Sequence, residues 1–271
     1  MSSSIEHDYA PVCDLYDRHL GPALFEPYAV DLAGRVANDR AEGSVLEMAC
    51  GTGILTQQLR TQLKPAVSLT ATDINPGMLD YAQMKLKSVK GIDWRQGDIA
   101  NLPFPDASFN AAVCQFGLMF VPDKNRAFRE MHRVLVKGGQ LTFSVWGCIE
   151  NNPWGVIAHE TVAHFFPNNP PQFFKAPFNS HDIDALRGLL TTNGFEQIEI
   201  QAIPKECLGN TAKSLAIGLI EGAPVLAEIQ ERGASPGPIV DAVTKALARI
   251  GGDAPFRSTM QAIAVTARAK G

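Results

Sequence analysis

The sequence predicts an α/β fold in which helices cover both faces of a largely parallel β-sheet. From residue 44 to residue 146, short apolar runs alternate with segments of helical pattern. Strands that are separated by helices in this way usually lie parallel in one sheet. The chain has 271 residues, of which 45% are hydrophobic and 19% are charged, so it is long and apolar enough to bury a large core.

Within this region the pattern predicts five strands and three helices. Asp123 is the expected N-cap of the third helix, and Pro76 suits the first turn of the second. The turn 137–139, Lys-Gly-Gly, is expected to lead into the fifth strand. The strands are predicted at 44–49, 67–72, 92–96, 109–115 and 140–146, and the helices at 54–63, 76–89 and 123–135.

Two further segments flank this alternation. Residues 5–40 are expected to be helical, with Pro11, Pro22 and Pro27 dividing them into pieces. After residue 146 we expect a helix at 182–192 and strands at 195–203 and 259–268. About 50 residues of helical pattern separate these two strands, far more than a hairpin needs. We assign this insertion, together with the N-terminal helices, to a cap over the open end of the sheet.

Charge and cysteine content exclude several classes of protein. The net charge is −4 and no run of Lys or Arg is present, so the basic face typical of nucleic-acid binding is not expected. The five cysteines are widely spaced and include no Cys-x-x-Cys pair, so we expect reduced thiols, no metal site and a cytoplasmic protein. The N-terminus lacks the pattern of a signal peptide, and no apolar stretch reaches the roughly 20 residues that span a bilayer.

The stretch VLEMACGTGILT, residues 45–56, contains the clearest binding signal. A strand that ends in a glycine-rich turn before a helix points backbone N–H groups at a ligand, and Gly51 and Gly53 let that ligand approach closely. The next strand ends at Asp73, twenty residues after Gly53. A carboxylate there can accept hydrogen bonds from both ribose hydroxyls, so the two features indicate an adenosine-type ligand.

Two residues favour a sulfonium cofactor over a dinucleotide. The dinucleotide fingerprint needs a third small residue under the pyrophosphate, and Thr56 stands at that position. The carboxylate of Glu47 would repel a pyrophosphate, because both are negatively charged, but it is compatible with a cationic ligand.

Four stretches in the correct order resemble the four motifs, and the helix–turn–strand after them, of class I S-adenosylmethionine-dependent methyltransferases. They are LEMACGTG (46–53), ATDINPGML (71–79), QGDIANLPFPDASFNAAVCQFGLMFVPD (96–123) and REMHRVLVKGGQLTFSVW (129–146). The pattern is most similar to small-molecule enzymes of the type-11 and ubiquinone/menaquinone-biosynthesis kind. One departure is VLVKGG, where the family usually has Lys-Pro-Gly-Gly. The resemblance implies a Rossmann-like sheet of seven strands whose last strand is antiparallel, with S-adenosylmethionine as the cofactor.

The resemblance also implies a division of the chain and a set of cofactor-binding residues. Residues 1–43 correspond to an N-terminal helical lid, 44–146 to the cofactor-binding core, and 147–271 to the rest of the sheet with an inserted cap for the acceptor. The glycine loop is expected to line the methionine part, Glu47 to hold the amino-acid end, and Asp73 to bind the ribose. The full set is Glu47, Ala49, Gly51, Gly53, Asp73, Ile74, Met78, Asp98, Ile99, Gln115 and Phe116.

By the same resemblance, Ile74 and Met78 flank the adenine, Asp98 meets its amino group, and Ile99 packs on the ring. Gln115 and Phe116, at the end of the fourth strand, are expected nearest the methyl group.

Catalysis and acceptor binding are expected to involve the lid and the cap. Methyl transfer needs mainly alignment of the reactants, and a general base only when the acceptor must lose a proton. His19 is the candidate base, because it shares one helical face with Tyr16 in the lid segment 14–29. Ordinary packing of this face on the domain is the alternative. The acceptor pocket is expected among the aromatic residues Trp146, Trp154, Phe165, Phe166, Phe173, Phe174 and Phe178, although any one of these, taken singly, is more often a core residue.

The sequence thus predicts a methyltransferase for a small, largely apolar or aromatic acceptor. The expected partner is that acceptor, with no nucleic acid and no membrane span, and a homodimer is considered alongside the monomer. Two rivals share part of the pattern. An NAD(P)-dependent oxidoreductase would use the glycines and Asp73 but leaves Gly97-Asp98 unexplained. A non-catalytic protein of the same fold would not need the intact loop and both acids.

Overall fold

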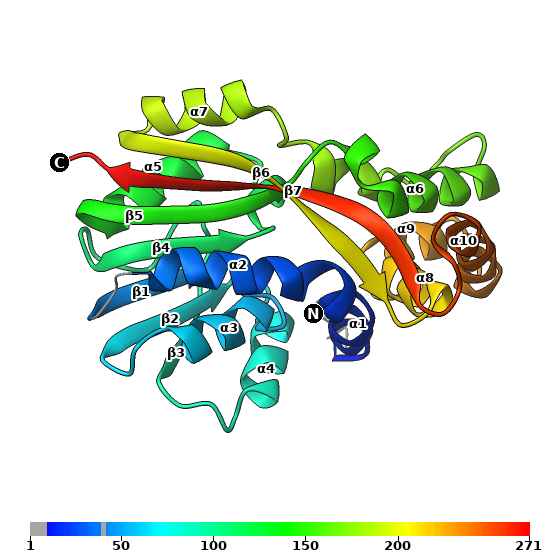
Figure 1. Cartoon of the computed structure of the whole chain (residues 1–271), viewed down its shortest axis with the longest axis horizontal. Helices are drawn as coiled ribbons and strands as arrows, with labels where there is room; N and C mark the ends of the chain where they lie inside the picture. The colour runs from blue at the N-terminus through cyan, green and yellow to red at the C-terminus, as the bar shows by residue number, and fades with distance from the viewer. Residues whose placement is uncertain (1–9, 39–41) are drawn as a thin grey trace, which may run out of the picture.

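The computed structural model describes residues 10–38 and 42–271, and its centre is a seven-stranded sheet (Figure 1). The strand order is β3-β2-β1-β4-β5-β7-β6. Strands β1 to β5 run parallel, and β7 is antiparallel to both β5 and β6. The predicted sheet with an antiparallel last strand is confirmed. The strands are β1 Gly43–Met48, β2 Val67–Asp73, β3 Ile92–Gln96, β4 Phe109–Gln115, β5 Leu135–Trp146, β6 Phe195–Gly209 and β7 Phe256–Ala269.

Side-chain caps begin three of the helices between these strands, and the predicted N-cap Asp123 is confirmed. The Asn75 side chain accepts hydrogen bonds from the first backbone N–H groups of α4, and Asp123 does so for α5. Asp182 caps α7 in the same way. In Figure 1, α3 lies in front of the sheet and α5 behind it. These helices are α3 Ile54–Gln62, α4 Pro76–Lys85, α5 Lys124–Val134 and α7 Ile183–Thr192.

The N-terminal segment is a continuous run of helical turns rather than separate pieces. It consists of α1 Ala10–Leu15, the π-helix η1 Tyr16–Phe25 and α2 Glu26–Ala37. The prediction that proline breaks this segment was wrong. Pro22 lies inside the π-helix and Pro27 is the second residue of α2, and the backbone stays helical through both positions. Residues 5–9, 39 and 40 of the predicted helical segment lie outside the described residues. The buried face of α2 packs against β4 and β5.

The helices of the cap gather at one end of the molecule (Figure 1). There β6 and β7 continue beyond the sheet as a two-stranded ribbon, in which residues 256–261 of β7 pair with β6. The ribbon carries the expected helical insertion between its two strands. The cap helices are α6 Pro153–Phe165, α8 Ala212–Ile220, α9 Val225–Glu231 and α10 Pro236–Gly251, with short 3₁₀ turns at η2 Leu118–Phe120, η3 Ile149–Asn151 and η4 Phe173–Phe178. No helix in the described ranges is long and apolar enough to cross a membrane.

Four of the aromatic residues expected around an acceptor pocket are core residues. Trp146, Trp154, Phe174 and Phe178 are each at most 5% exposed. The Trp146 and Trp154 rings lie 5.3 Å apart, and the Trp154 and Phe178 rings 5.8 Å apart. These side chains fill space between β5, α6 and η4, so they stabilise the junction of sheet and cap by burying apolar surface.

Candidate functional site

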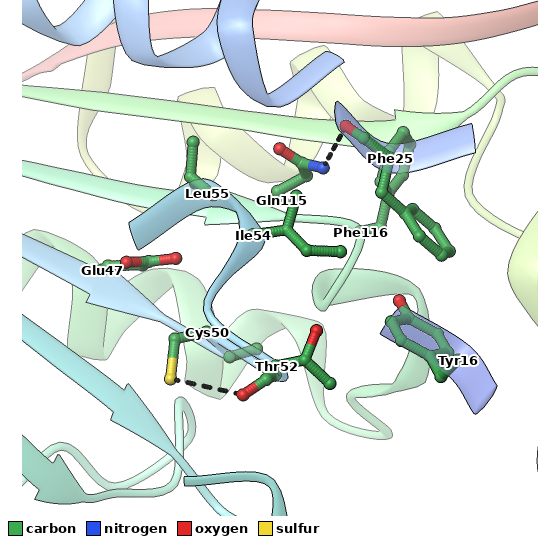
Figure 2. A pocket seen from close by; sticks show the side chains of 11 residues that line it. Tyr16, Phe25, Glu47, Cys50, Thr52, Ile54, Leu55, Gln115 and Phe116 are labelled. Carbon is green, nitrogen blue, oxygen red and sulfur yellow. Dashed lines mark hydrogen bonds between the residues drawn. The ribbon is translucent and has the colours of Figure 1, made fainter. Parts of the chain in front are cut away.

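A small cavity of about 40 Å³ lies at the carboxyl ends of β1 and β4, beneath the N-terminal segment (Figure 2). In open parallel sheets this is the edge where ligands bind, because β1 and β4 lie at the point where the strand order reverses. The lining residues come from β1, the glycine loop, the start of α3, the end of β4 and the π-helix: Tyr16, Phe25, Glu47, Ala49, Cys50, Gly51, Thr52, Ile54, Leu55, Gln115 and Phe116.

The glycine loop has the conformation that its residues allow. Gly51 and Gly53 have φ values of 54° and 78°, in the left-handed region that glycine tolerates without strain. A Cβ at Gly53 would lie 3.0 Å from Leu86 and 3.2 Å from Ala82, so this glycine also permits the loop to pack closely against the end of α4. A Cβ at Gly51 would meet nothing within 4 Å. The loop therefore presents bare backbone to open space at Gly51.

Ala49 adopts the same left-handed conformation without being glycine. Its φ is 53°, which costs about 1 kcal/mol for a residue with a side chain. The Ala49 methyl group points at Gly117, where an added Cβ would come within 2.5 Å of it. Gly117 therefore leaves the room that the Ala49 side chain occupies.

Glu47 is a buried acid at the cavity wall. It is only 1% exposed, and its Oε2 atom has no hydrogen-bond partner among the described residues. Burial raises the pKa of the Glu47 carboxyl to about 8, because a charge in this position would lose its hydration. A cation in the cavity would supply the missing partner and favour the ionised form.

Asp73 ends β2 and holds the loop in place. One carboxylate oxygen accepts a hydrogen bond from Gly51 N at 2.8 Å, and the other accepts one from Asn75 N at 2.9 Å. Burial raises the pKa of Asp73, and the backbone donors oppose this shift. Each oxygen keeps a second lone pair, so the carboxylate can still accept from a ribose.

The residues predicted around adenine differ in their exposure. Ile74 is 62% exposed and Asp98 is also exposed, whereas Ile99 is 6% exposed. Asp98 Oδ1 accepts a hydrogen bond from Ala100 N at 2.8 Å. Met78 is half-buried, with its sulfur 3.4 Å from the Cys13 thiol of α1. All four lie beside the carboxyl ends of β2 and β3, outside the enclosed cavity.

The π-helix supplies the aromatic wall of the cavity. Tyr16 and Phe25 are nine residues apart, which is about two and a half turns of an α-helix and would put them on opposite sides. Nine residues make about two of the wider turns of a π-helix, so the two side chains return to one face. Their rings stack at 4.8 Å with an interplanar angle of 19°. Figure 2 shows both rings beside Phe116.

Three polar residues that sequence reasoning missed join the π-helix to the loop and to α4. Asp17 Oδ1 accepts a hydrogen bond from Thr52 Oγ1 at 2.7 Å and an ion-pair contact from Lys85 Nζ at 2.6 Å. Thr52 stands between the two loop glycines, and Lys85 ends α4. No local pattern indicates this contact, because Asp17 lies 35 residues from Thr52 and 68 residues from Lys85.

His19, the predicted base, is not among the residues that line the cavity. Its Nδ1 atom lies 2.8 Å from Ser214 Oγ on α8, so the side chain faces the cap. Burial, followed by the charge of Arg18, lowers the pKa of the His19 imidazole. The expectation that Tyr16 and His19 share one face assumed α-helical periodicity, which the π-helix does not follow. The described residues contain no cluster of His, Cys, Asp and Glu suited to a metal ion.

The family model and the related proteins that match this chain all point to methyltransferases. Residues 46–143 match the family described as a methyltransferase domain. A demethylmenaquinone methyltransferase of Staphylococcus epidermidis is 30% identical over 180 residues, covering 61% of this chain and 73% of that protein. One from Lactobacillus johnsonii is 35% identical over 136 residues, covering 48% and 54%. A ubiquinone/menaquinone biosynthesis C-methyltransferase of Hahella chejuensis is 38% identical over 121 residues, covering 44% and 47%. The chain therefore spans about half the length of the latter two relatives.

Solved structures show the same fold at low sequence identity. A phosphoethanolamine N-methyltransferase 2 of Haemonchus contortus in complex with S-adenosyl-L-methionine has a TM-score of 0.62 and 13% identity, covering 98% of this chain and 58% of that chain. A putative methyltransferase of Bacillus halodurans has a TM-score of 0.60 and 18% identity, covering 89% and 99%.

Proposed function

The chain belongs to the class I family of S-adenosylmethionine-dependent methyltransferases that act on small molecules, and from this premise we propose that it methylates a small, largely apolar or aromatic acceptor. The observation that carries the proposal is the cavity at the strand tips, where a bare-backbone loop meets the unpartnered Oε2 of Glu47. A buried carboxyl group with an unpartnered oxygen, next to a glycine whose backbone faces open space, fits a ligand whose amino-acid end carries a positive charge.

In this proposal each residue at the strand tips holds one part of the cofactor. The backbone of Ala49, Gly51 and Gly53 lines the methionine part, and Glu47 binds its ammonium group. Asp73 accepts from the ribose hydroxyls while it keeps Gly51 in position. Ile74, Met78, Asp98 and Ile99 surround the adenine.

When bound, the sulfonium supplies an already activated methyl group, so the protein contributes mainly by alignment and by excluding water. Well-oriented reactants gain on the order of 7–11 kcal/mol. Phe25 and Phe116 present apolar rings at the cavity, which favours an apolar acceptor. A cavity of about 40 Å³ holds about one water molecule, so only a small part of the cofactor can lie in it while the N-terminal helices keep this position.

The same proposal assigns roles to the three parts of the chain. Residues 1–43 form the lid, 44–146 hold the cofactor, and 147–271 complete the sheet and carry the acceptor cap. The relatives carry names of bacterial biosynthetic enzymes, and the free cysteines Cys13, Cys50, Cys114, Cys148 and Cys207 agree with a reducing cytoplasm. We propose a homodimer as the alternative to a monomer. Light scattering after gel filtration distinguishes the two.

Calorimetric titration and a transfer assay test the function. S-adenosylhomocysteine is expected to bind and NADH is not. With labelled S-adenosylmethionine, transfer is then measured across phenols, quinone precursors, amines and fatty or polyketide acids. Binding of NADH without S-adenosylhomocysteine would contradict the cofactor assignment. Cofactor binding with no transfer to any acceptor would favour a non-catalytic protein.

A further inference from the structure

A groove of about 490 Å³ lies between α6 and α10 on the surface of the cap. The two helices pack against each other at the end of the molecule opposite the C-terminus of the chain (Figure 1). No residue that lines this groove also lines the cavity at the strand tips. The groove is therefore a second surface feature, separate from the proposed cofactor site.

The two sides of the groove carry charges of opposite sign. The α6 side contributes Glu160, the α10 side contributes Lys245 and Arg249, and all three side chains are exposed. None of the three forms an ion pair with another described residue. In the neighbouring α9, by contrast, Glu228 pairs with Arg232 at 3.6 Å. The groove therefore presents an acid on one side and two bases on the other, without partners in the described chain.

The shape of the groove leaves room for a large side chain. Ala242 and Ala246 are one turn apart on the same face of α10, and both are half-buried in the groove. Phe165, at the end of α6, is 42% exposed, and Ile250 beside Arg249 is 53% exposed. Single exposed apolar residues are common, but these two border an open groove whose α10 side is formed by small residues. The surface thus combines an apolar space with apolar side chains that are left in solvent.

A surface with this arrangement of charges is complementary to itself. A two-fold axis brings the same patch of two copies together, so each contact between different residues occurs twice. The acidic side of each copy then faces the basic side of the other. We propose that the groove between α6 and α10 is the interface of a homodimer, in which Glu160 of each copy pairs with Lys245 or Arg249 of the other.

A second copy fits this groove better than a small charged molecule does. An anion would be repelled by Glu160, and a cation would be repelled by the two bases. A second copy satisfies both signs at once, and its Phe165 packs over Ala242 and Ala246, so the burial of apolar surface adds to the charge pairing. This inference goes beyond the proposed function and does not depend on it, because it assigns a surface to the homodimer considered there.

Analytical ultracentrifugation of the wild-type protein is the first test. One chain has a mass of 29.3 kDa. We expect the measured mass to approach twice this value as the concentration rises from about 1 to about 100 µM, because non-obligate interfaces associate in the micromolar range or below. A protein that stays monomeric throughout overturns the inference, and calorimetry with decanoate then shows whether the groove takes a small amphiphile instead.

Reversal of the charges tests which surface the dimer uses. Glu160→Lys makes both sides of the groove basic, and the double variant Lys245→Glu/Arg249→Glu makes both sides acidic. Each variant brings like charges together twice in its own dimer, so we expect self-association to weaken at least about 10-fold. Glu199→Lys, on an exposed residue of β6, is the matched control and should dimerise as the wild type does. Undiminished dimerisation of both reversed variants overturns the inference.

An equimolar mixture of the two reversed variants restores every charge pair. In the mixed dimer each side of the groove again faces the opposite charge on the other chain. We expect this mixture to form a dimer although neither variant does so alone, a result that misfolding cannot produce. A mixture that stays monomeric while the wild type dimerises overturns the assignment to this groove.

A variant without a charge change decides the matter if a reversed variant does not fold. Phe165→Ala shortens an exposed side chain at the end of α6, and we expect it to weaken dimerisation at least about 10-fold. Unchanged dimerisation of this variant overturns the inference. S-adenosylhomocysteine binding, measured in parallel by calorimetry, should be the same in all variants, and its absence from the wild type would contradict the proposed function alone.

Discussion

The Thr52 hydroxyl donates a hydrogen bond of 2.7 Å to the Asp17 carboxylate, and this contact joins the lid to the glycine loop. The same oxygen of Asp17 also contacts Lys85 Nζ at 2.6 Å. Both side chains of the ion pair are about four-fifths shielded from solvent. Since the cavity lies directly beneath the π-helix, Asp17 connects this helix, part of the proposed lid, to the loop that is proposed to hold the cofactor.

Replacing Asp17 should therefore loosen the lid. We expect Asp17→Ala to raise the association and the dissociation rate constants of S-adenosylhomocysteine by about 10-fold each, because about 1.4 kcal/mol less energy holds the lid closed. Stopped-flow measurements give both rate constants.

Asp14→Ala is the matched control, because Asp14 lies in the same segment and forms an exposed ion pair with Arg18. It is expected to leave both rate constants unchanged. Identical kinetics for Asp17→Ala and the wild type would show that Asp17 does not hold the lid.

The strained Ala49 provides a stability prediction. Ala49→Gly removes a side chain from a residue with φ of 53°, so the free energy of unfolding is expected to rise by roughly 1 kcal/mol. Gly117→Ala is expected to lower it by about 1–3 kcal/mol, because the new Cβ would lie 2.5 Å from the Ala49 methyl and 2.8 Å from Cys114 Sγ. Chemical denaturation measures both changes.

The double variant tests whether the two positions act on each other. Because glycine at position 49 removes one of the two clashes, Ala49→Gly should recover part of the stability lost in Gly117→Ala. Strictly additive effects would show that the two side chains do not compete for the same space.

Glu47 should make stability depend on pH. Its pKa rises from 4.5 in the unfolded chain to about 8 in the folded protein, so the folded state binds more protons between these values. The resulting stability is fully present below about pH 4.5 and is lost as the pH rises through about 8, with an upper limit on the order of 5 kcal/mol.

The variant Glu47→Gln isolates this effect. It should flatten the fall in the free energy of unfolding between pH 5 and pH 8 relative to the wild type, as measured by denaturation at several pH values. The comparison is needed because Asp73, whose pKa is also raised, contributes in the same direction. Parallel pH profiles for wild type and Glu47→Gln would mean that Glu47 does not titrate in this range.

Asp73 is expected to serve both the loop and the cofactor. Asp73→Ala leaves the N–H groups of Gly51 and Asn75 without their acceptor, so unfolding free energy should fall by about 1–3 kcal/mol. S-adenosylhomocysteine affinity should fall by at least about 10-fold, measured by calorimetry below the unfolding temperature.

Asp98→Ala is the comparison variant, since this exposed side chain binds only Ala100 N among the described residues. It should leave the free energy of unfolding nearly unchanged and lower the affinity for S-adenosylhomocysteine only modestly. Unchanged affinity in Asp73→Ala would remove Asp73 from the proposed site.

Much of the sheet could be predicted because its signals are local. The strand that leads into the turn at Gly51 and the strand that ends at Asp73 are recognisable from neighbouring residues, and the two strands pair in parallel in the structure. Asp123 was identified as a cap from the residues that follow it, and the structure confirms this. Such features depend on a few successive side chains, which the sequence displays directly.

The lid could not be predicted in the same way. An α-helical period placed Tyr16 and His19 together, whereas the π-helix brings Tyr16 to Phe25 and leaves His19 beside Ser214. The width of each turn is set by how the whole segment packs on the sheet and the cap. No residue within the segment indicates that packing.

The sequence by itself determined the order of strands and helices, the glycine loop and the acids at the strand ends, because periodicity, capping and turn chemistry act between near neighbours. Only the tertiary structure decided that Trp146 fills the core instead of walling a pocket, and that Asp17 meets Thr52. Contacts between residues far apart in the chain depend on which surfaces are left to bury once the elements have formed, and that competition is settled only when the whole fold is packed.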